Sequence, residues 1–194
     1  LLKRKQVGFY PNSESVKPYI AGNKLKSINL DGRILEYDVY IITAGVKPVT
    51  DLFSQAKIEI GRSGAVRVDN KLCTSDSNIY AAGDCAEVMN HVTRRHEFLP
   101  LATFARDYGH TAGANAAGEH IRTNTVVKNI SFKIFENYCV TVGLTSYEAV
   151  ENRISFKAVD GSVPNLVTVM PGSQNVYGKI LFSTDNKRIL GASF

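Results

Sequence analysis

Two nearly continuous runs of β-branched, aromatic and small residues constrain the fold more than any other feature of this sequence. The first covers residues 38–45 and ends at Gly45, and the second covers 78–86 and contains Gly83 followed by Asp84. Such runs are typical of parallel strands that are buried on both faces of a sheet. In open α/β sheets, ligands bind beyond the carboxyl ends of the strands. The sequence therefore predicts an α/β fold with a candidate ligand site at Gly83 and Asp84.

Shorter local signals place the remaining elements. Asp31-Gly32 predicts a hairpin turn, and Pro100 precedes a helix that we expect over 101–121. Thr145 and Glu148 have the spacing of a capping box. From residue 124 onward, short strand candidates alternate with turns, which predicts an antiparallel α+β unit. The further expected elements are strands at 24–30 and 33–37, a short helix near residue 52, a strand at 65–69, a loop at 88–100, and strands at 131–136, 139–143, 154–159, 166–170, 177–182 and 188–194.

Composition and charge exclude several classes of protein. Hydrophobic residues make up 44% and charged residues 21% of the 194, which is ordinary for a folded globular chain. The net charge is +5, but the basic residues are scattered, and neither basic run (3–5 and 94–96) is interleaved with aromatic residues. Nucleic-acid binding is therefore the less favoured reading of the charge. No apolar run reaches the roughly 18 residues that a membrane span needs, so we expect no membrane partner.

The cysteines predict a reducing compartment. Cys73, Cys85 and Cys139 are odd in number and widely spaced, and no Cys-x-x-Cys occurs. This usage is typical of buried free thiols in a cytoplasmic protein. No histidine stands at a metal-ligand spacing from any of them, so we expect no metal site.

Several segments resemble one protein family. Residues 74–84, a threonine followed by an apolar strand closing in Gly-Asp, are similar to the second flavin-binding signature of FAD-dependent pyridine nucleotide–disulfide oxidoreductases. Residues 41–48 look like the strand and Gly-x-x-Pro turn that close the family's NAD-binding domain, with Lys47 where arginine is more usual. Residues 99–102 and the helix after them are similar to the element that presents its N-terminus to the flavin. The segment 143–149 is most similar to the branch of NADH oxidases, NADH peroxidases and coenzyme A-disulfide reductases.

The resemblance implies a domain organisation. Residues 1–48 would end an NAD(P)-binding domain, 49–123 would end a FAD-binding domain, and 124–194 would be an incomplete interface domain. The fold class is thus α/β and α+β, the remnant of a two-dinucleotide-domain flavoprotein of the three-layer ββα type followed by an antiparallel α+β interface domain. No Gly-x-Gly-x-x-Gly occurs in the sequence, and the first residue is leucine. We therefore expect the chain to be a C-terminal fragment, with the redox cysteine upstream and no catalytic residue of its own.

The resemblance also assigns residues to a flavin site. Asp84 would bind the ribityl chain, Gly83 would give it room, and the helix start would point N–H groups at the flavin pyrimidine. The cofactor-binding candidates are Gly45, Gly83, Asp84, Pro100, Leu101, Ala102 and Thr103. The competing interpretations are a plain strand-ending turn for Gly83-Asp84, a packing helix started by proline, and a structural role for Gly45.

The activity implied for the intact protein is hydride transfer from NAD(P)H to FAD and then to oxygen, peroxide or a disulfide. The intact protein would be a homodimer that acts on a small-molecule electron acceptor. The isolated chain is expected to retain neither FAD nor NAD(P)H and to turn over no substrate. The alternative is a stand-alone, non-enzymatic dimerisation module derived from the same family.

Overall fold

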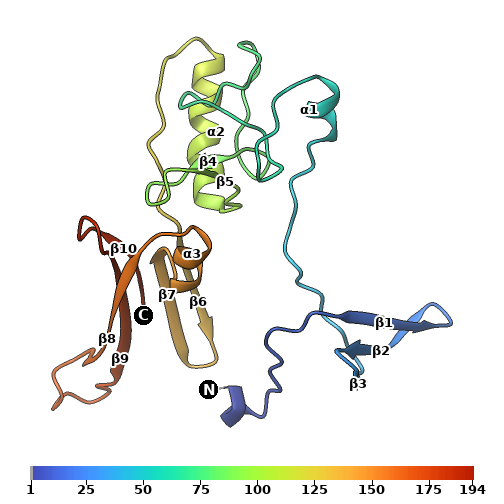
Figure 1. Ribbon diagram of the computed structural model, residues 1–194, viewed down its shortest axis with the longest axis vertical. Coiled ribbons are helices and arrows are strands. Elements are labelled where there is room, and N and C mark those ends of the chain that lie inside the picture. Colours follow the sequence, from blue (N-terminus) through green and yellow to red (C-terminus); the bar gives the residue numbers. More distant parts are fainter. Residues whose placement is uncertain (1) are drawn as a thin grey trace. The chain divides into compact units, whose positions relative to one another are not determined.

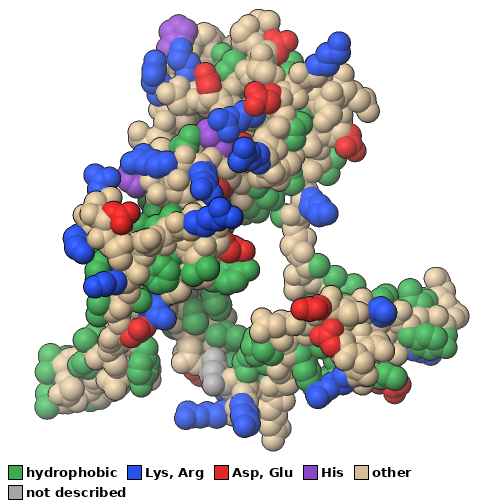
Figure 2. Space-filling model, in the orientation of Figure 1, with side chains coloured by type: hydrophobic (Ala, Val, Ile, Leu, Met, Phe, Trp, Pro, Cys, Tyr) green, Lys and Arg blue, Asp and Glu red, His purple; other side chains and the backbone are tan. Residues whose placement is uncertain are grey.

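The computed structural model describes residues 2–194, which divide into two compact units, Leu1–Val46 and Lys47–Phe194 (Figure 1). Each unit is described by itself. Among the described residues, no helix combines the length and the apolar character that a membrane span requires. Basic side chains are interspersed with acidic and hydrophobic ones on the visible face of the second unit (Figure 2).

The first unit is built around an antiparallel three-stranded meander. Its elements are η1 (Leu2–Lys5), β1 (Val16–Ala21), β2 (Lys24–Leu30) and β3 (Arg33–Leu35), with strand order β1-β2-β3. The predicted Asp31-Gly32 hairpin is confirmed, with φ of 50° and 89° at the two residues. Positive φ at both central positions gives a turn whose twist matches that of the flanking strands.

The predicted parallel strand at 38–45 is not formed. Ile41 and Ile42 are 84% and 79% exposed, and the segment has no regular secondary structure. Within the described residues no strand lies parallel to it, so its backbone has no ladder partner. A buried central strand exists only where neighbours pair with it on both sides, and the apolar composition of 38–45 does not supply them.

The second unit begins with a core that α2 covers. Its elements are α1 (Asp51–Gln55), the two-stranded pair of β4 (Val88–Met89) and β5 (His96–Glu97), and α2 (Ala102–Ala116). The loop predicted at 88–100 therefore contains a short hairpin. The core cluster comprises Ile58, Val66, Val68, Leu72, Ala81, Ala86, Val88, Tyr108, Ala112 and Val126.

The strands predicted at 65–69 and 78–86 are also absent as regular strands. They contribute only isolated bridges, including a parallel one between Val66 and Ala86 and an antiparallel one between Cys73 and Tyr80. Their small apolar residues still enter the core, since Val66 is fully buried and Ala81 and Ala86 are nearly so. The burial predicted for 78–86 is therefore confirmed at Ala81 and Ala86 but not at Ile79, which is 37% exposed, and the predicted ladder pairing is wrong.

The helix expected over 101–121 is confirmed but ends earlier, at Ala116. Gly118 adopts φ 102° just after the C-terminal end. The N–H groups of Gly118 and Glu119 donate to the carbonyls of Asn115 and Ala114, both at 3.1 Å. This pair of bonds closes the helix in a Schellman motif.

The C-terminal part of the second unit is the predicted antiparallel α+β structure. The strands β6 (Asn129–Ile134), β7 (Asn137–Gly143), β8 (Phe156–Pro164), β9 (Asn175–Ser183) and β10 (Ile189–Ser193) pair in the order β6-β7-β10-β9-β8. Helix α3 (Ser146–Glu151) packs Ala149 against Leu144, Leu181 and Leu190. The capping box of Thr145 and Glu148 is confirmed in full.

One predicted strand, 166–170, is wrong. The segment instead forms the turn that joins β8 to β9. The Met170 N–H donates to the Val167 carbonyl at 2.8 Å, and the Asn165 N–H donates to the Gln174 carbonyl at 2.9 Å. These local bonds fold the segment back on itself, so its valines are left exposed.

Candidate functional site

The Gly83-Asp84 pair lies in a tight turn whose far end is anchored to the core. Gly83 has φ 82°, a conformation that glycine adopts without a steric penalty. The Ala86 N–H donates to the Gly83 carbonyl at 3.1 Å, and the Cys85 carbonyl accepts from the Val66 N–H at 2.7 Å. Asp84 is exposed at the tip. Among residues 2–194 its carboxylate forms no ion pair or side-chain hydrogen bond, so it is available to a ligand's hydroxyl groups.

The N-terminus of α2 presents free backbone donors. Leu101 is the N-cap residue, with extended φ and ψ of −125° and 126°, and no side chain caps the helix. The first bond along the helix runs from the Ala105 N–H to the Leu101 carbonyl at 3.0 Å. The N–H groups of Ala102 and Thr103 therefore have no partner in the described chain, and both residues are exposed.

The turn and the helix start lie together. A Cβ built on Gly83 would be 3.7 Å from the Cβ of Ala105, one turn into α2. The structure thus brings Gly83 and Asp84 to the end of α2 that carries Pro100 to Thr103. Gly45 has φ 83° but belongs to the first unit, so the structure does not join it to the other candidates.

This arrangement fits the half of a flavin cofactor that carries the ribityl chain and the ring system. A helix N-terminus attracts negative charge, by about 0.3–1 kcal/mol when exposed. The pyrimidine edge of a flavin gains such charge on reduction. An exposed carboxylate beside it is an acceptor for hydroxyl groups. Gly83 has open space on the remaining sides, because only Ala105 lies within 4 Å of a built Cβ.

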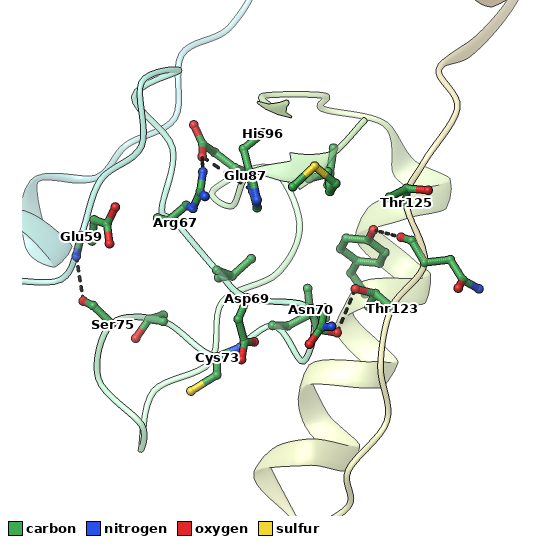
Figure 3. Close-up of a pocket in the computed structure, with 17 residues that line it drawn as sticks. Glu59, Arg67, Asp69, Asn70, Cys73, Ser75, Glu87, His96, Thr123 and Thr125 are labelled. Carbon is green, nitrogen blue, oxygen red and sulfur yellow. Dashed lines mark hydrogen bonds and ion pairs between the residues drawn. The ribbon is translucent and has the colours of Figure 1, made fainter. Parts of the chain in front are cut away.

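A separate cavity of about 550 Å³ is lined by residues of this core (Figure 3). Val68, Leu72 and Tyr108 form part of its apolar lining, and none of the cofactor-binding candidates lines it. Two of its polar residues, Glu87 and His96, were not singled out from the sequence. Glu87 stands in an apolar run between Ala86 and Val88, and that position was the only signal of its burial.

The wall of this cavity carries a buried charged cluster. Glu87 is 1% exposed; its carboxylate accepts from the Ser63 hydroxyl at 2.8 Å and pairs with Arg67 at 3.4 Å. The Nδ1 atom of His96 is buried without a hydrogen-bond partner and lies 4.0 Å from the same carboxylate. Burial lowers the pKa of His96, and Arg67 lowers it further, against the opposing effect of Glu87.

All three cysteines are free, and each is half-buried rather than fully buried as expected. Burial raises the pKa of Cys73, and the carboxylates of Asp69 and Asp76 raise it further. A nucleophilic thiol needs the opposite shift. Among residues 2–194, no group of three or more His, Cys, Asp or Glu side chains is placed to hold a metal ion.

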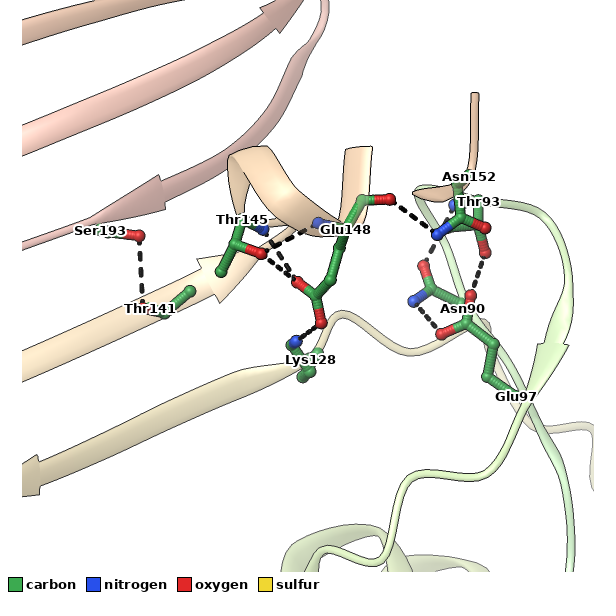
Figure 4. Close-up of polar contacts among 9 residues, drawn as sticks. All are labelled: Asn90, Thr93, Glu97, Lys128, Thr141, Thr145, Glu148, Asn152 and Ser193. Atoms are coloured by element: carbon green, nitrogen blue, oxygen red, sulfur yellow. Dashed lines mark hydrogen bonds and ion pairs between the residues drawn. The ribbon is translucent and has the colours of Figure 1, made fainter. Parts of the chain in front are cut away.

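Polar contacts gather around the β4–β5 hairpin and at the start of α3 (Figure 4). In the β4–β5 hairpin, Asn90 donates to Glu97 at 2.8 Å and Arg95 donates to Asn152 at 3.2 Å. At the start of α3, Lys128 pairs with Glu148. Burial raises the pKa of Glu148, but its bonds from Lys128 and Thr145 outweigh that effect, and the net shift is downward.

The second unit therefore combines a glycine turn with an exposed carboxylate, a helix N-terminus without a side-chain cap, and an antiparallel α+β part. Residues 1–105 match the family described as pyridine nucleotide-disulphide oxidoreductase. The chain belongs to this family.

Individual relatives agree in sequence and fold. The chain is 32% identical over 184 residues to an NADH oxidase of Streptococcus pyogenes, covering 92% of this chain and 39% of that protein. It is similar to the structure of a NAD-dependent persulfide reductase from A. fulgidus, with TM-score 0.92, 27% identity, and coverage of 99% and 36%. It is also similar to a FAD-dependent pyridine nucleotide-disulphide oxidoreductase from Desulfovibrio vulgaris, with TM-score 0.83, 29% identity, and coverage of 99% and 46%. The chain thus spans less than half the length of each.

Proposed function

We propose that this chain supplies the flavin-contacting turn, the flavin-facing helix and the subunit-interface domain of a FAD-dependent NAD(P)H oxidoreductase. Bound FAD would supply the two-electron chemistry that connects hydride from NAD(P)H to oxygen, peroxide or a disulfide as acceptor. The main support is the packing of the Gly83-Asp84 turn on α2, where the Gly83 position lies 3.7 Å from Ala105.

Each candidate residue has a defined task in this proposal. The Asp84 carboxylate accepts hydrogen bonds from the hydroxyl groups of the ribityl chain. The N–H groups of Ala102 and Thr103 stabilise negative charge at the pyrimidine edge. Pro100 and Leu101 fix where the helix starts, since proline and an extended N-cap residue end the preceding loop.

A homodimer is part of the proposal. Val142, Ile180 and Val159 lie in one cross-strand row through Ala192, and they are 41%, 40% and 57% exposed. They face away from Leu181, which is buried against α3. An apolar row without a partner on the described chain is a surface that a second subunit would cover. With three free thiols, we place the intact protein in the cytoplasm.

A chimera tests the flavin assignment. The chain replaces the matching segment of the S. pyogenes NADH oxidase, and flavin content and NADH consumption are measured. We expect the chimera to retain FAD. Asp84→Asn should weaken FAD binding by about 10- to 100-fold, because it removes a charged hydrogen-bond acceptor.

Asp107→Asn is the matched control, since Asp107 is exposed on α2 and pairs only with its neighbour Arg106. Equal FAD affinity in the two variants would refute the role of Asp84. A chain that forms a stable dimer by itself, combined with a chimera that binds no flavin, would favour the stand-alone dimerisation module.

A further inference from the structure

Glu87 holds together segments that are distant in sequence. Besides the bond from the Ser63 hydroxyl, its carboxylate accepts from the Ser63 N–H at 3.2 Å and from Arg67 at 3.4 Å. Its own N–H donates to the Val66 carbonyl at 2.9 Å. A carboxylate buried this completely is stable only while such partners remain, because desolvation penalises the charge.

The missing side chain at Gly61 leaves the space that the Glu87 carboxylate fills. A Cβ on Gly61 would overlap the Glu87 carboxylate group. Gly61 itself is fixed, since its N–H donates to the Ala65 carbonyl at 2.8 Å. Any larger residue there would push Glu87 out of its contacts.

Glu87 and His96 stand next to the two halves of the candidate flavin site. Glu87 follows the turn that presents Gly83 and Asp84, and the Ala86 N–H closes that turn. His96 lies on β5, whose chain leads within five residues to Leu101 at the start of α2. The β4–β5 pairing places Val88 opposite Glu97 and Met89 opposite His96. Both halves of the site therefore lie within five residues of this pair along the chain.

We propose that Glu87, acting with His96, is a positioning residue that sets the turn at 83–86 relative to the N-terminus of α2, so that this geometry responds to the charge on the pair. The pair does not touch the cofactor. The inference rests on the proposed function for what the site binds, but the coupling is a property of the chain alone.

Three charged groups face His96. These are Arg67 and Glu87, from the segments packed on it, and Glu59 at a longer range; the β4 residue opposite it, Met89, carries no charge. Neutral His96 makes no hydrogen bond to Glu87 across 4.0 Å. Protonated His96 would be attracted to the carboxylate, and this movement would be passed to β5 and to the chain leading into α2.

The test is a pH titration of the isotopically labelled 194-residue chain by nuclear magnetic resonance, without flavin. We expect the backbone amide signals of Asp84 and Cys85 to shift together with those of Ala102 and Thr103, with one midpoint below pH 6.5. His96→Gln should abolish this shared transition. Glu87→Gln should move it to lower pH, because the carboxylate that favours the imidazolium is gone.

Hydrogen exchange gives a second readout. In Glu87→Gln the amides of Ala86 and Glu87 should exchange about tenfold faster than in the wild-type chain, because a buried acceptor of several bonds has lost its charge. Glu148→Gln is the matched control, since it removes a half-buried paired carboxylate from the other core. Equal acceleration in the two variants would overturn the proposal.

The outcomes separate this inference from the flavin proposal. Amide signals that do not titrate together, or that still do so in His96→Gln, would overturn the positioning role. If Glu87→Gln fails to fold, the His96→Gln titration decides alone. A shared transition supports the coupling whether or not the Asp84→Asn chimera later shows a flavin defect.

Discussion

The close pairing of β7 with β10 provides the most direct test of the packing in this sheet. Gly143 and Gly191 are paired in register, and the Leu144 N–H donates to the Leu190 carbonyl at 3.0 Å beside them. A Cβ added at Gly191 would lie 2.6 Å from the Leu144 nitrogen and would also overlap the Leu144 carbonyl. The nitrogen and the carbonyl that obstruct the Cβ are both backbone groups of Leu144, so no side-chain rotation relieves the overlap.

Gly191→Ala should therefore destabilise the chain at the upper end of the range for overpacking, about 3 kcal/mol. For a chain of this size, 1 kcal/mol shifts Tm by about 2–4 °C, so we expect a fall of about 6–12 °C in thermal unfolding followed by circular dichroism.

Gly109→Ala is the opposite control. Gly109 lies within α2 with nothing within 4 Å of its built Cβ, so alanine should stabilise the helix by about 0.5–1 kcal/mol. An unchanged Tm in Gly191→Ala, or equal shifts in the two variants, would refute the close approach of β7 and β10.

Three further predictions concern protonation, helix capping and cofactor retention. The pKa of His96 is lowered from 6.5 in the folded chain, so the unfolded chain binds more protons just below that pH. The free energy of unfolding, measured with urea, should therefore fall as the pH drops from 7.5 towards 5. His96→Gln should reduce this dependence on pH. Thr145→Ala removes the capping box of α3 and should cost about 1 kcal/mol in urea denaturation, whereas an unchanged midpoint would show that the cap contributes nothing. The purified chain should carry no flavin absorption and take up none when FAD is added; tight binding would show that the elements at 83–84 and 100–103 suffice for the site.

Elements with a strong local signal were predictable from the sequence. Asp31-Gly32 adopts the positive φ values that its residue types favour, and Thr145 and Glu148 form their reciprocal bonds within four residues. The N-cap residue of α2, Leu101, directly follows Pro100. In each case the residues that carry the signal also make the contacts, so no distant partner is needed.

Some errors fall where the structure depends on distant partners, and others where local turns end or replace a regular element. Residues 38–45 and 78–86 have strand composition, but a strand is completed by neighbours that composition does not supply. Residues 166–170 have the apolar content of a strand, but Pro164 and Pro171 flank them and local turns close the segment. Helix α2 ends five residues before its predicted boundary because the Schellman bonds at Gly118 close it.

The candidate site combines local geometry that the sequence predicts with a contact between distant residues that it does not predict. Gly83 and Pro100 each impose their own local geometry, which is why a resemblance based on short motifs found both halves. The contact between the two halves does not follow from these local signals. It depends on the packing of Ala105 against Gly83 and on the Glu87 carboxylate, which is buried against residues 61–67 and His96. No periodicity or turn signal announces such a carboxylate, and a lone glutamate in an apolar run reads as an interruption. A charged residue that interrupts an apolar run close to a candidate ligand turn therefore merits mutation alongside the turn itself.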